Sequence, residues 1–280
     1  MLPRAAAPRC LVPPKGTSPW PGGGRIGTVT GMTLVTFEEV GRVAVITLNR
    51  PEARNAINPP MAEAIGAAVD RLENDANLRV GVLAATLTEP RPVFCAGNDL
   101  RSFDGKPAVT PVGGFAGLVD YPRTKPLIAA VDGLATSGGC EIVLACDLVV
   151  ASTRSSFAVA EIRWNLGPLA GGLIRLPRML GRAPAMDMIL TGQPISAERA
   201  YQLGLVSTLT DSDVRQAALE RAEIIAGHSP DTIRINLQTA HKAATFGENE
   251  LWKASDEAAE KIFSSAAFRE GLETFAARKA

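Results

Sequence analysis

The sequence has only two histidines, His228 and His241, among its 280 residues. A zinc site usually draws on several histidine or cysteine ligands held close together, and a Ser-His-Asp triad needs a histidine beside its nucleophile. The four cysteines show no paired spacing typical of metal ligands. We therefore expect no metal site and no histidine-based triad. The cysteines are interpreted as reduced, buried thiols of a cytoplasmic protein.

The chain also lacks an excess of charge of either sign. Lysine and arginine together number 29, and aspartate and glutamate together number 29, so the formal net charge is +0. No overall field would attract nucleic acid or an anionic membrane. No apolar run reaches the ~18 residues that a membrane span needs. We expect neither nucleic acid nor a membrane as a partner, and a small molecule as the ligand.

Residues 1–31 contain no acidic residue, because the first one in the chain is Glu38. An acid-poor, arginine-containing leader is typical of a mitochondrial transit peptide. Six prolines and the run Gly22-Gly23-Gly24 disfavour the amphipathic helix that such a peptide forms. We interpret residues 1–31 as a disordered extension that can be removed. The patterned sequence starts at Met32, which is an alternative translation start.

Several short segments are almost continuously apolar, as expected for strands that are covered on both faces. These are residues 43–48, 80–85, 127–131 and 148–151. Helical spacing of apolar residues lies between several of them, for example over 59–75. This alternation predicts an α/β core with crossover connections over residues 32–228. Residues 229–280 show only amphipathic helical spacing and are predicted to need a partner surface.

Two loops have the composition of a site that binds an anion. The first is Phe94-Cys95-Ala96-Gly97-Asn98-Asp99-Leu100, where small residues allow close approach of another molecule to the backbone. The second runs from an apolar strand through Gly133 and Ser137-Gly138-Gly139 into an apolar helix. Unpaired N–H groups at a helix start can hold an anion or a developing oxyanion. Taken alone, each loop is equally compatible with a tight turn or close packing.

Two carboxylic acids follow the second loop. Glu141 lies three residues after Gly138, on the same helix face, among apolar neighbours. Glu161 follows the apolar residues 157–160. Burial raises the pKa of a carboxyl group, which suits general acid–base catalysis near neutral pH. The alternative is that both acids are structural, in ion pairs with Arg154 or Arg163.

Four segments in this order resemble the crotonase superfamily, the enoyl-CoA hydratases and isomerases. They are residues 49–56, 94–100, 133–141 and 195–206. The resemblance extends from about Met32 to the C-terminus. It implies a β-β-α superhelix followed by a helical region that forms trimers, often dimers of trimers.

The resemblance also implies an activity, the hydration of 2-trans-enoyl-CoA to 3-hydroxyacyl-CoA in metabolism of the fatty-acid type. The thioester oxygen would accept hydrogen bonds from the N–H groups of Ala96 and Gly138. Glu141 would activate water and Glu161 would deliver a proton to the α-carbon. No cofactor is implied, because coenzyme A is part of the substrate. The residues implied to bind it are Arg54, Ala96, Gly97, Asn98, Asp99, Gly138, Arg278 and Lys279.

Three positions depart from the family pattern. Ser137 replaces a glycine, Asn98 replaces the commoner alanine, and Leu169 replaces a glycine beside the catalytic water. The last two leave open a Δ3,Δ2-enoyl-CoA isomerase that uses Glu161 alone. A non-catalytic CoA-binding paralogue is a further alternative. Isomerases generally lack an acid at the position of Glu141, so the pair of acids favours a hydratase.

Overall fold

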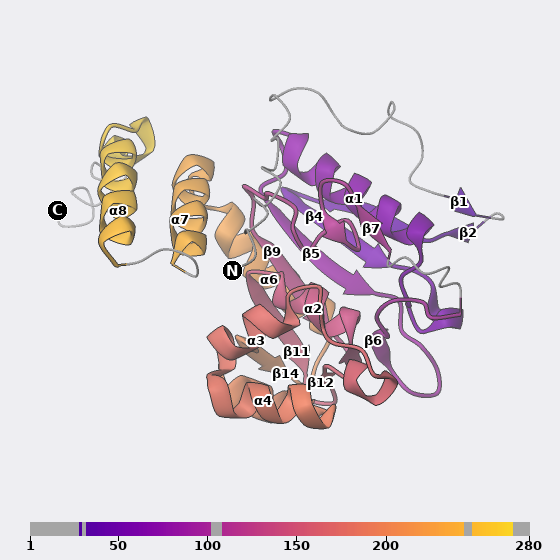
Figure 1. Cartoon of the computed structure of the whole chain (residues 1–280). Coiled ribbons are helices and arrows are strands. Elements are labelled where there is room, and N and C mark those ends of the chain that lie inside the picture. Colours follow the sequence, from indigo (N-terminus) through magenta and orange to yellow (C-terminus); the bar gives the residue numbers. More distant parts are fainter. Residues whose placement is uncertain (1–27, 30–31, 102–107, 244–247, 271–280) are drawn as a thin grey trace.

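The computed structural model describes residues 28–29, 32–101, 108–243 and 248–270. Its centre is a six-stranded sheet with the order β14-β11-β9-β5-β4-β3 (Figure 1). The strands are β3 (Val35–Val40), β4 (Val43–Leu48), β5 (Val80–Ala85), β9 (Leu127–Val131), β11 (Leu148–Ser152) and β14 (Thr208–Thr210). β3 pairs antiparallel with β4, and all other neighbours in this sheet are parallel. The segments predicted as strands at 43–48, 80–85, 127–131 and 148–151 all lie in this sheet.

Helices cover both faces of the large sheet, which explains the apolar strands. α1 (Pro59–Asn74) buries Met61, Ile65 and Leu72 in the larger core cluster. α6 (Val214–Ala226) buries Ala218 and Ala222 in a second cluster on the other face. Successive side chains of a strand point to opposite faces, so burial on both faces requires apolar residues at nearly every position.

A smaller four-stranded sheet, of order β13-β12-β10-β6, lies beside the first. It consists of β6 (Val93–Cys95), β10 (Leu134–Thr136), β12 (Ser156–Ala158) and β13 (Ile195–Ser196). The chain repeatedly passes from a strand of the large sheet to one of the small sheet and then to a helix. Thus β9 leads to β10 and α2 (Gly138–Leu144), and β11 leads to β12 and the 3-10 helix η2 (Glu161–Trp164). This repeat is the predicted β-β-α superhelix.

The remaining elements surround the two sheets. They are β1 (Thr28–Val29), β2 (Met32–Thr33), η1 (Pro51–Ala53), β7 (Val109–Thr110), β8 (Gly114–Phe115), α3 (Gly172–Leu180), α4 (Arg182–Thr191), α5 (Ala197–Gln202), α7 (Pro230–Lys242) and α8 (Glu248–Phe263). β1 pairs with β2, so regular pairing begins inside the predicted extension 1–31, at Thr28. None of the helices within the described ranges is long and apolar enough to cross a membrane.

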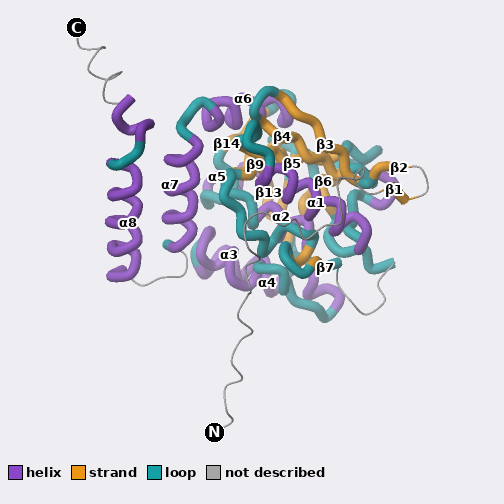
Figure 2. The backbone as a smooth tube through the Cα atoms, turned by 90° about the horizontal axis from the view of Figure 1, so that it is seen from above, coloured by secondary structure: helices purple, strands orange, loops and turns teal. Residues whose placement is uncertain are grey.

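α7 and α8 stand apart from the two sheets (Figures 1 and 2). α7 is attached to the body through the buried side chain of Ile235 and through His241, whose Nε2 lies 2.7 Å from Asp147 Oδ1. The main packing partner of α8 is α7. Residues 229–270 thus form a helical arm rather than part of the central core.

Candidate active site

The loop after β6 and the start of α2 meet at their backbones. Gly97 has a φ of +90° and a Cβ added to it would lie 2.8 Å from the Gly138 nitrogen. A Cβ added to Gly138 would lie 3.5 Å from the Asn98 nitrogen. The absence of a side chain at Gly97 therefore lets the two loops approach closely, and the N–H groups of Asn98 and Gly138 lie near each other.

The structure corrects the predicted pair of N–H donors. The Ala96 N–H donates to the Arg54 carbonyl at 3.1 Å, so this donor is already in use. Among the described residues, the N–H groups of Asn98 and Gly138 have no hydrogen-bond acceptor. Gly138 begins α2, where the helix leaves its first N–H groups unpaired and its dipole adds positive potential. The N–H groups left open at this junction are thus those of Asn98 and Gly138 rather than that of Ala96.

Asp99 holds this loop in place through its carboxyl group. Its carboxyl is 8% exposed and accepts from Arg50 Nη1 at 2.7 Å and from the Arg101 N–H at 3.0 Å. Asn55 is fully buried and donates to the carbonyls of Val93 and Phe94 in β6. Neither Arg50 nor Asn55 was predicted to support this loop, although both lie in the segment 49–56.

Glu141 lies in α2, one turn after Gly138, and is 3% exposed. Its Oε1 accepts the Gly172 N–H at 2.9 Å, at the start of α3. Burial raises the pKa of Glu141 to about 7, and the nearby negative charge of Glu161 also raises it. Hydrogen bonds from the N–H groups of Gly172 and Ala170 and the positive charge of Arg175 oppose this rise.

Glu161 begins η2 and is 9% exposed. Burial raises its pKa, while its own N–H and the Ser137 side chain oppose the rise. Its Oε2 is buried and has no hydrogen-bond partner within the described part of the chain. Arg154 pairs with Asp132 instead of with either glutamate. The two acids are therefore buried and close enough for the charge of Glu161 to act on Glu141, and Arg154 is not their counter-ion.

Two of the departures from the family pattern have distinct structural settings. Ser137 has a φ of +54° and a ψ of −132°, a conformation that favours glycine and costs a residue with a side chain about 1–3 kcal/mol. Leu169 is 81% exposed, so its side chain does not narrow the space between the acids in this chain.

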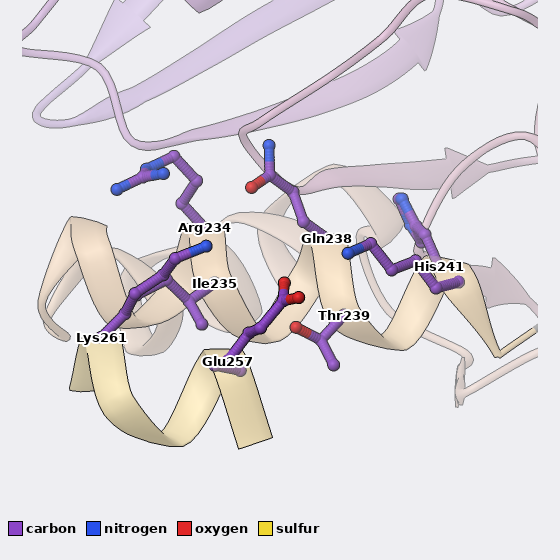
Figure 3. Close-up of a pocket in the computed structure, with 9 residues that line it drawn as sticks. Arg234, Ile235, Gln238, Thr239, His241, Glu257 and Lys261 are labelled. Atoms are coloured by element: carbon purple, nitrogen blue, oxygen red, sulfur yellow. The ribbon is translucent and has the colours of Figure 1, made fainter. Parts of the chain in front are cut away.

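A pocket of about 440 Å³ lies in the helical arm, between α7 and α8. Its labelled lining residues are Arg234, Ile235, Gln238, Thr239, His241, Glu257 and Lys261 (Figure 3). None of the predicted site residues lines this pocket. This pocket is therefore distinct from the region of the two acids and the two open N–H groups. Arg278 and Lys279 lie outside the described residues, and the Arg54 side chain is exposed beside the first loop.

Comparison with known proteins agrees with this geometry. A family model described as enoyl-CoA hydratase/isomerase matches residues 38–280. Enoyl-CoA hydratase EchA19 of Mycobacterium tuberculosis is 34% identical over 91% of this chain and 98% of its own length. A probable enoyl-CoA hydratase of Rhizobium meliloti is 33% identical over 86% of this chain and 94% of its own. The crystal structure of enoyl-CoA hydratase EchA1 from Mycobacterium marinum matches with a TM-score of 0.81 and 36% identity, covering 88% of this chain and 96% of that one.

Proposed function

The chain belongs to the enoyl-CoA hydratase/isomerase family, and we propose that it adds water to 2-trans-enoyl-CoA thioesters to give 3-hydroxyacyl-CoA. The observation that carries this proposal is the pair of buried acids, Glu141 and Glu161, beside two N–H groups without acceptors. Water addition needs a base for the water, an acid for the α-carbon and a donor pair for the enolate oxygen. This site provides all three.

The N–H groups of Asn98 and Gly138 would bind the thioester carbonyl oxygen. Attack by water on the β-carbon moves negative charge onto this oxygen, so donors fixed in advance stabilise the transition state more than the substrate. The start of α2 contributes the positive end of its helix dipole at the same point. Loss of one such donor typically costs about 2.7–4 kcal/mol of transition-state stabilisation.

Glu141 would act as the base and Glu161 as the acid. With a pKa of about 7, Glu141 is partly ionised near neutral pH, and the Gly172 N–H fixes its Oε1. The ionised carboxylate would accept a proton from water. The raised pKa of Glu161 keeps a larger share of this group protonated, and its unpartnered Oε2 would deliver that proton to the α-carbon. The two groups titrate as a coupled pair.

The coenzyme A part of the substrate would extend over the first loop, past Gly97 and Asn98, to the exposed side chain of Arg54. Arg278 and Lys279 are retained as candidates to meet a CoA phosphate. Coenzyme A belongs to the substrate in this scheme, so the reaction as proposed uses no separate cofactor. We also propose a cytoplasmic location, which agrees with the free, buried thiols of Cys95, Cys140 and Cys146.

The second candidate function is Δ3,Δ2-enoyl-CoA isomerisation. Asn98 is the residue that favours it, because the sequence Asn98-Asp99-Leu100 resembles that of some isomerases in the family. An isomerase needs only one carboxylate to move a proton between two carbons, and Glu161 would suffice. The buried Glu141 would then be left without a chemical role, which is why hydration is preferred.

The purified protein is expected to remove the enoyl-thioester absorbance of crotonyl-CoA and to bind acetoacetyl-CoA competitively. The measurement is the initial rate of absorbance loss, beside a parallel assay with a 3-enoyl-CoA. Hydration faster than isomerisation supports the proposal. Isomerisation without hydration would replace it with the second candidate, and no binding of acetoacetyl-CoA in calorimetry would contradict both.

We propose that the helical arm brings copies of this chain together as a homotrimer or a dimer of trimers. A groove of about 570 Å³ between α7 and α8 is lined mostly by apolar residues, among them Ala240, Ala259, Ile262 and Phe263. Phe263 is 63% exposed although it is a large aromatic residue. The apolar surface of α7 and α8 is not covered by the core of the same chain. Burying this surface against a second copy is therefore favourable.

Light scattering is expected to give a mass of three or six times the 29.4 kDa of one chain. Phe263→Glu should shift the protein toward monomer, because it places a charge on the apolar groove. Leu190→Glu is the matched control, since Leu190 is 62% exposed but lies on α4. A wild-type protein that remains monomeric at assay concentration would contradict the proposed assembly.

A further inference from the structure

The turn that leads into α3 carries the N–H group that holds Glu141. Gly171 and Gly172 lie in this turn, and the Gly172 N–H donates to Glu141 Oε1 at 2.9 Å. A Cβ added to Gly172 would lie 3.1 Å from Glu141 Oε1 and 2.6 Å from the Pro168 Cβ. The absence of a side chain at Gly172 therefore leaves room for the carboxyl group beside the turn. A shift of this turn would move the N–H away from the carboxyl group.

The half-buried side chain of Arg175, on α3, lies against the same turn. The Arg175 N–H donates to the Gly171 carbonyl at 2.7 Å, one helical turn earlier in the chain. Arg175 Nη1 donates to the Ala170 carbonyl at 3.3 Å. Gly171 has a φ of +106°, and a Cβ added to it would lie 2.1 Å from Arg175 Nη1. Glycine at 171 therefore suits both the backbone conformation and the guanidinium that lies against it.

The second hydrogen bond of the guanidinium connects this turn to a different part of the chain. Arg175 Nη2 donates at 2.8 Å to the carbonyl of Val119, a buried residue in the segment after β8. Phe115, in β8, packs on the start of α2, because a Cβ added to Gly138 would lie 2.6 Å from its ring. The Val119 N–H donates to the Phe115 carbonyl at 3.2 Å, so both contacts belong to one short segment. Arg175 thus bridges the turn that holds Glu141 and the segment that packs against Gly138.

We propose that Arg175 is a positioning residue, whose guanidinium fixes the turn 170–172 against the Val119 carbonyl and so keeps the Gly172 N–H on the Glu141 carboxyl. A guanidinium is a rigid, planar fork, so it can hold two carbonyl groups at a fixed separation, which a single ammonium group cannot do. The inference rests on the proposed function, because it concerns the geometry of the base that activates water.

The guanidinium also acts on Glu141 through its charge. Burial raises the pKa of Glu141 to about 7, and the Gly172 N–H and the positive charge of Arg175 oppose this rise. Both stabilise the ionised carboxylate, so the pKa rises further when either is weakened. A base must be ionised to accept a proton. Loss of Arg175 would therefore move the acidic limb of the kcat profile to higher pH.

The test compares Arg175→Gln with Arg175→Lys, and Arg178→Gln, at an exposed position on α3, is the matched control. Glutamine removes both the charge and the fork, whereas lysine keeps the charge and loses the fork. We measure kcat and KM for crotonyl-CoA from about pH 5 to about pH 10. Both Arg175 variants should lower the maximum of kcat about tenfold, with KM within about twofold of wild type. The acidic limb should move upward by about one pH unit in Arg175→Gln and by less in Arg175→Lys.

Hydrogen exchange, followed by mass spectrometry over residues 168–176, reports on the turn without reference to activity. The Gly172 N–H is hydrogen-bonded to Glu141, so its exchange with solvent depends on how firmly the turn is held. Exchange of this segment should be about tenfold faster in both Arg175 variants. Arg178→Gln should leave the exchange rate, the kcat and the acidic limb as in wild type.

The outcomes separate a positioning role from a purely structural one. A lower melting temperature with an unchanged pH profile and unchanged exchange over 168–176 would overturn the proposal, as would a maximum of kcat within about twofold of wild type in Arg175→Lys. If Arg175→Gln does not fold, the kcat and the exchange of Arg175→Lys decide alone. Absence of hydration by the wild-type protein contradicts the proposed function, whereas unchanged exchange in the variants contradicts the role of Arg175.

Discussion

Replacing Glu141 with glutamine is expected to lower kcat for hydration of crotonyl-CoA by about 10²–10⁴-fold. Glutamine keeps the volume of the side chain and can still accept the Gly172 N–H, but it cannot take a proton from water. Binding of acetoacetyl-CoA should remain within about twofold of wild type, because Glu141 contributes to the reaction and not to the coenzyme site. The measurements are steady-state kinetics and calorimetry on the same preparations.

The same substitution is also expected to change the free energy of unfolding, and the raised pKa of Glu141 determines the direction of that change. Burial raises the pKa of Glu141 from 4.5 to about 7, so the folded protein binds this proton more tightly than the unfolded chain does. The resulting stabilisation is fully present below about pH 4.5 and is lost as the pH rises through about 7. At pH ~8 the ionised carboxylate therefore costs the folded state up to about 3 kcal/mol relative to a neutral side chain.

Glu141→Gln should consequently melt at a higher temperature than wild type at pH ~8, and this gain should shrink toward pH ~5. A variant that is inactive but more stable cannot owe its inactivity to unfolding. Glu223→Gln, at an exposed position on α6, is the matched control and should change neither kcat nor the melting temperature. If Glu141→Gln hydrates crotonyl-CoA at the wild-type rate, Glu141 is not the base, and its only role is to hold the start of α3 through the Gly172 N–H.

The large sheet could be predicted from the sequence, because each apolar run that indicates a strand lies within that strand. Four apolar runs predicted strands at their observed positions, since strands covered on both faces need apolar residues throughout. Ser196 is of a residue type that favours the N-cap position, and as the N-cap of α5 it accepts the Arg199 N–H at 3.2 Å. The three-residue strands β6, β10 and β12 were not predicted, because segments so short show no periodicity and end in small residues.

Part of the site could be predicted from the sequence. The rest depends on contacts between residues that are far apart in the chain. The positions of Glu141 and Glu161 followed from their apolar neighbours and from the family resemblance. Hydrogen bonds between distant segments determine which backbone N–H groups remain unpaired. The hydrogen bond from the Ala96 N–H to the Arg54 carbonyl is an example, because no pattern in the sequence near Ala96 predicts it. The same holds for Asp99, which pairs with Arg50 at a separation of 49 residues. The composition of the loop 94–100 does not distinguish a residue that contacts coenzyme A from a residue that holds the loop in place.

Glu161→Gln is expected to abolish hydration and any isomerisation together, each by about 10²–10⁴-fold. Both reactions move a proton to or from a carbon next to the thioester, and we propose Glu161 Oε2, which has no partner among the described residues, for this step. Removal of Glu141 affects only the activation of water. The decisive quantity is therefore the ratio of the hydration rate to the isomerisation rate in the two glutamine variants.

The ratio separates the two candidate functions. In a hydratase with incidental isomerase activity, Glu141→Gln lowers the hydration rate but leaves most of the isomerisation rate, whereas Glu161→Gln lowers both. A chain that is purely an isomerase turns over a 3-enoyl-CoA at a near-normal rate after Glu141→Gln and shows no hydration even in wild type. If Glu161→Gln instead retains hydration within about tenfold of wild type, the proton comes from another group, and Glu161 loses its assigned role.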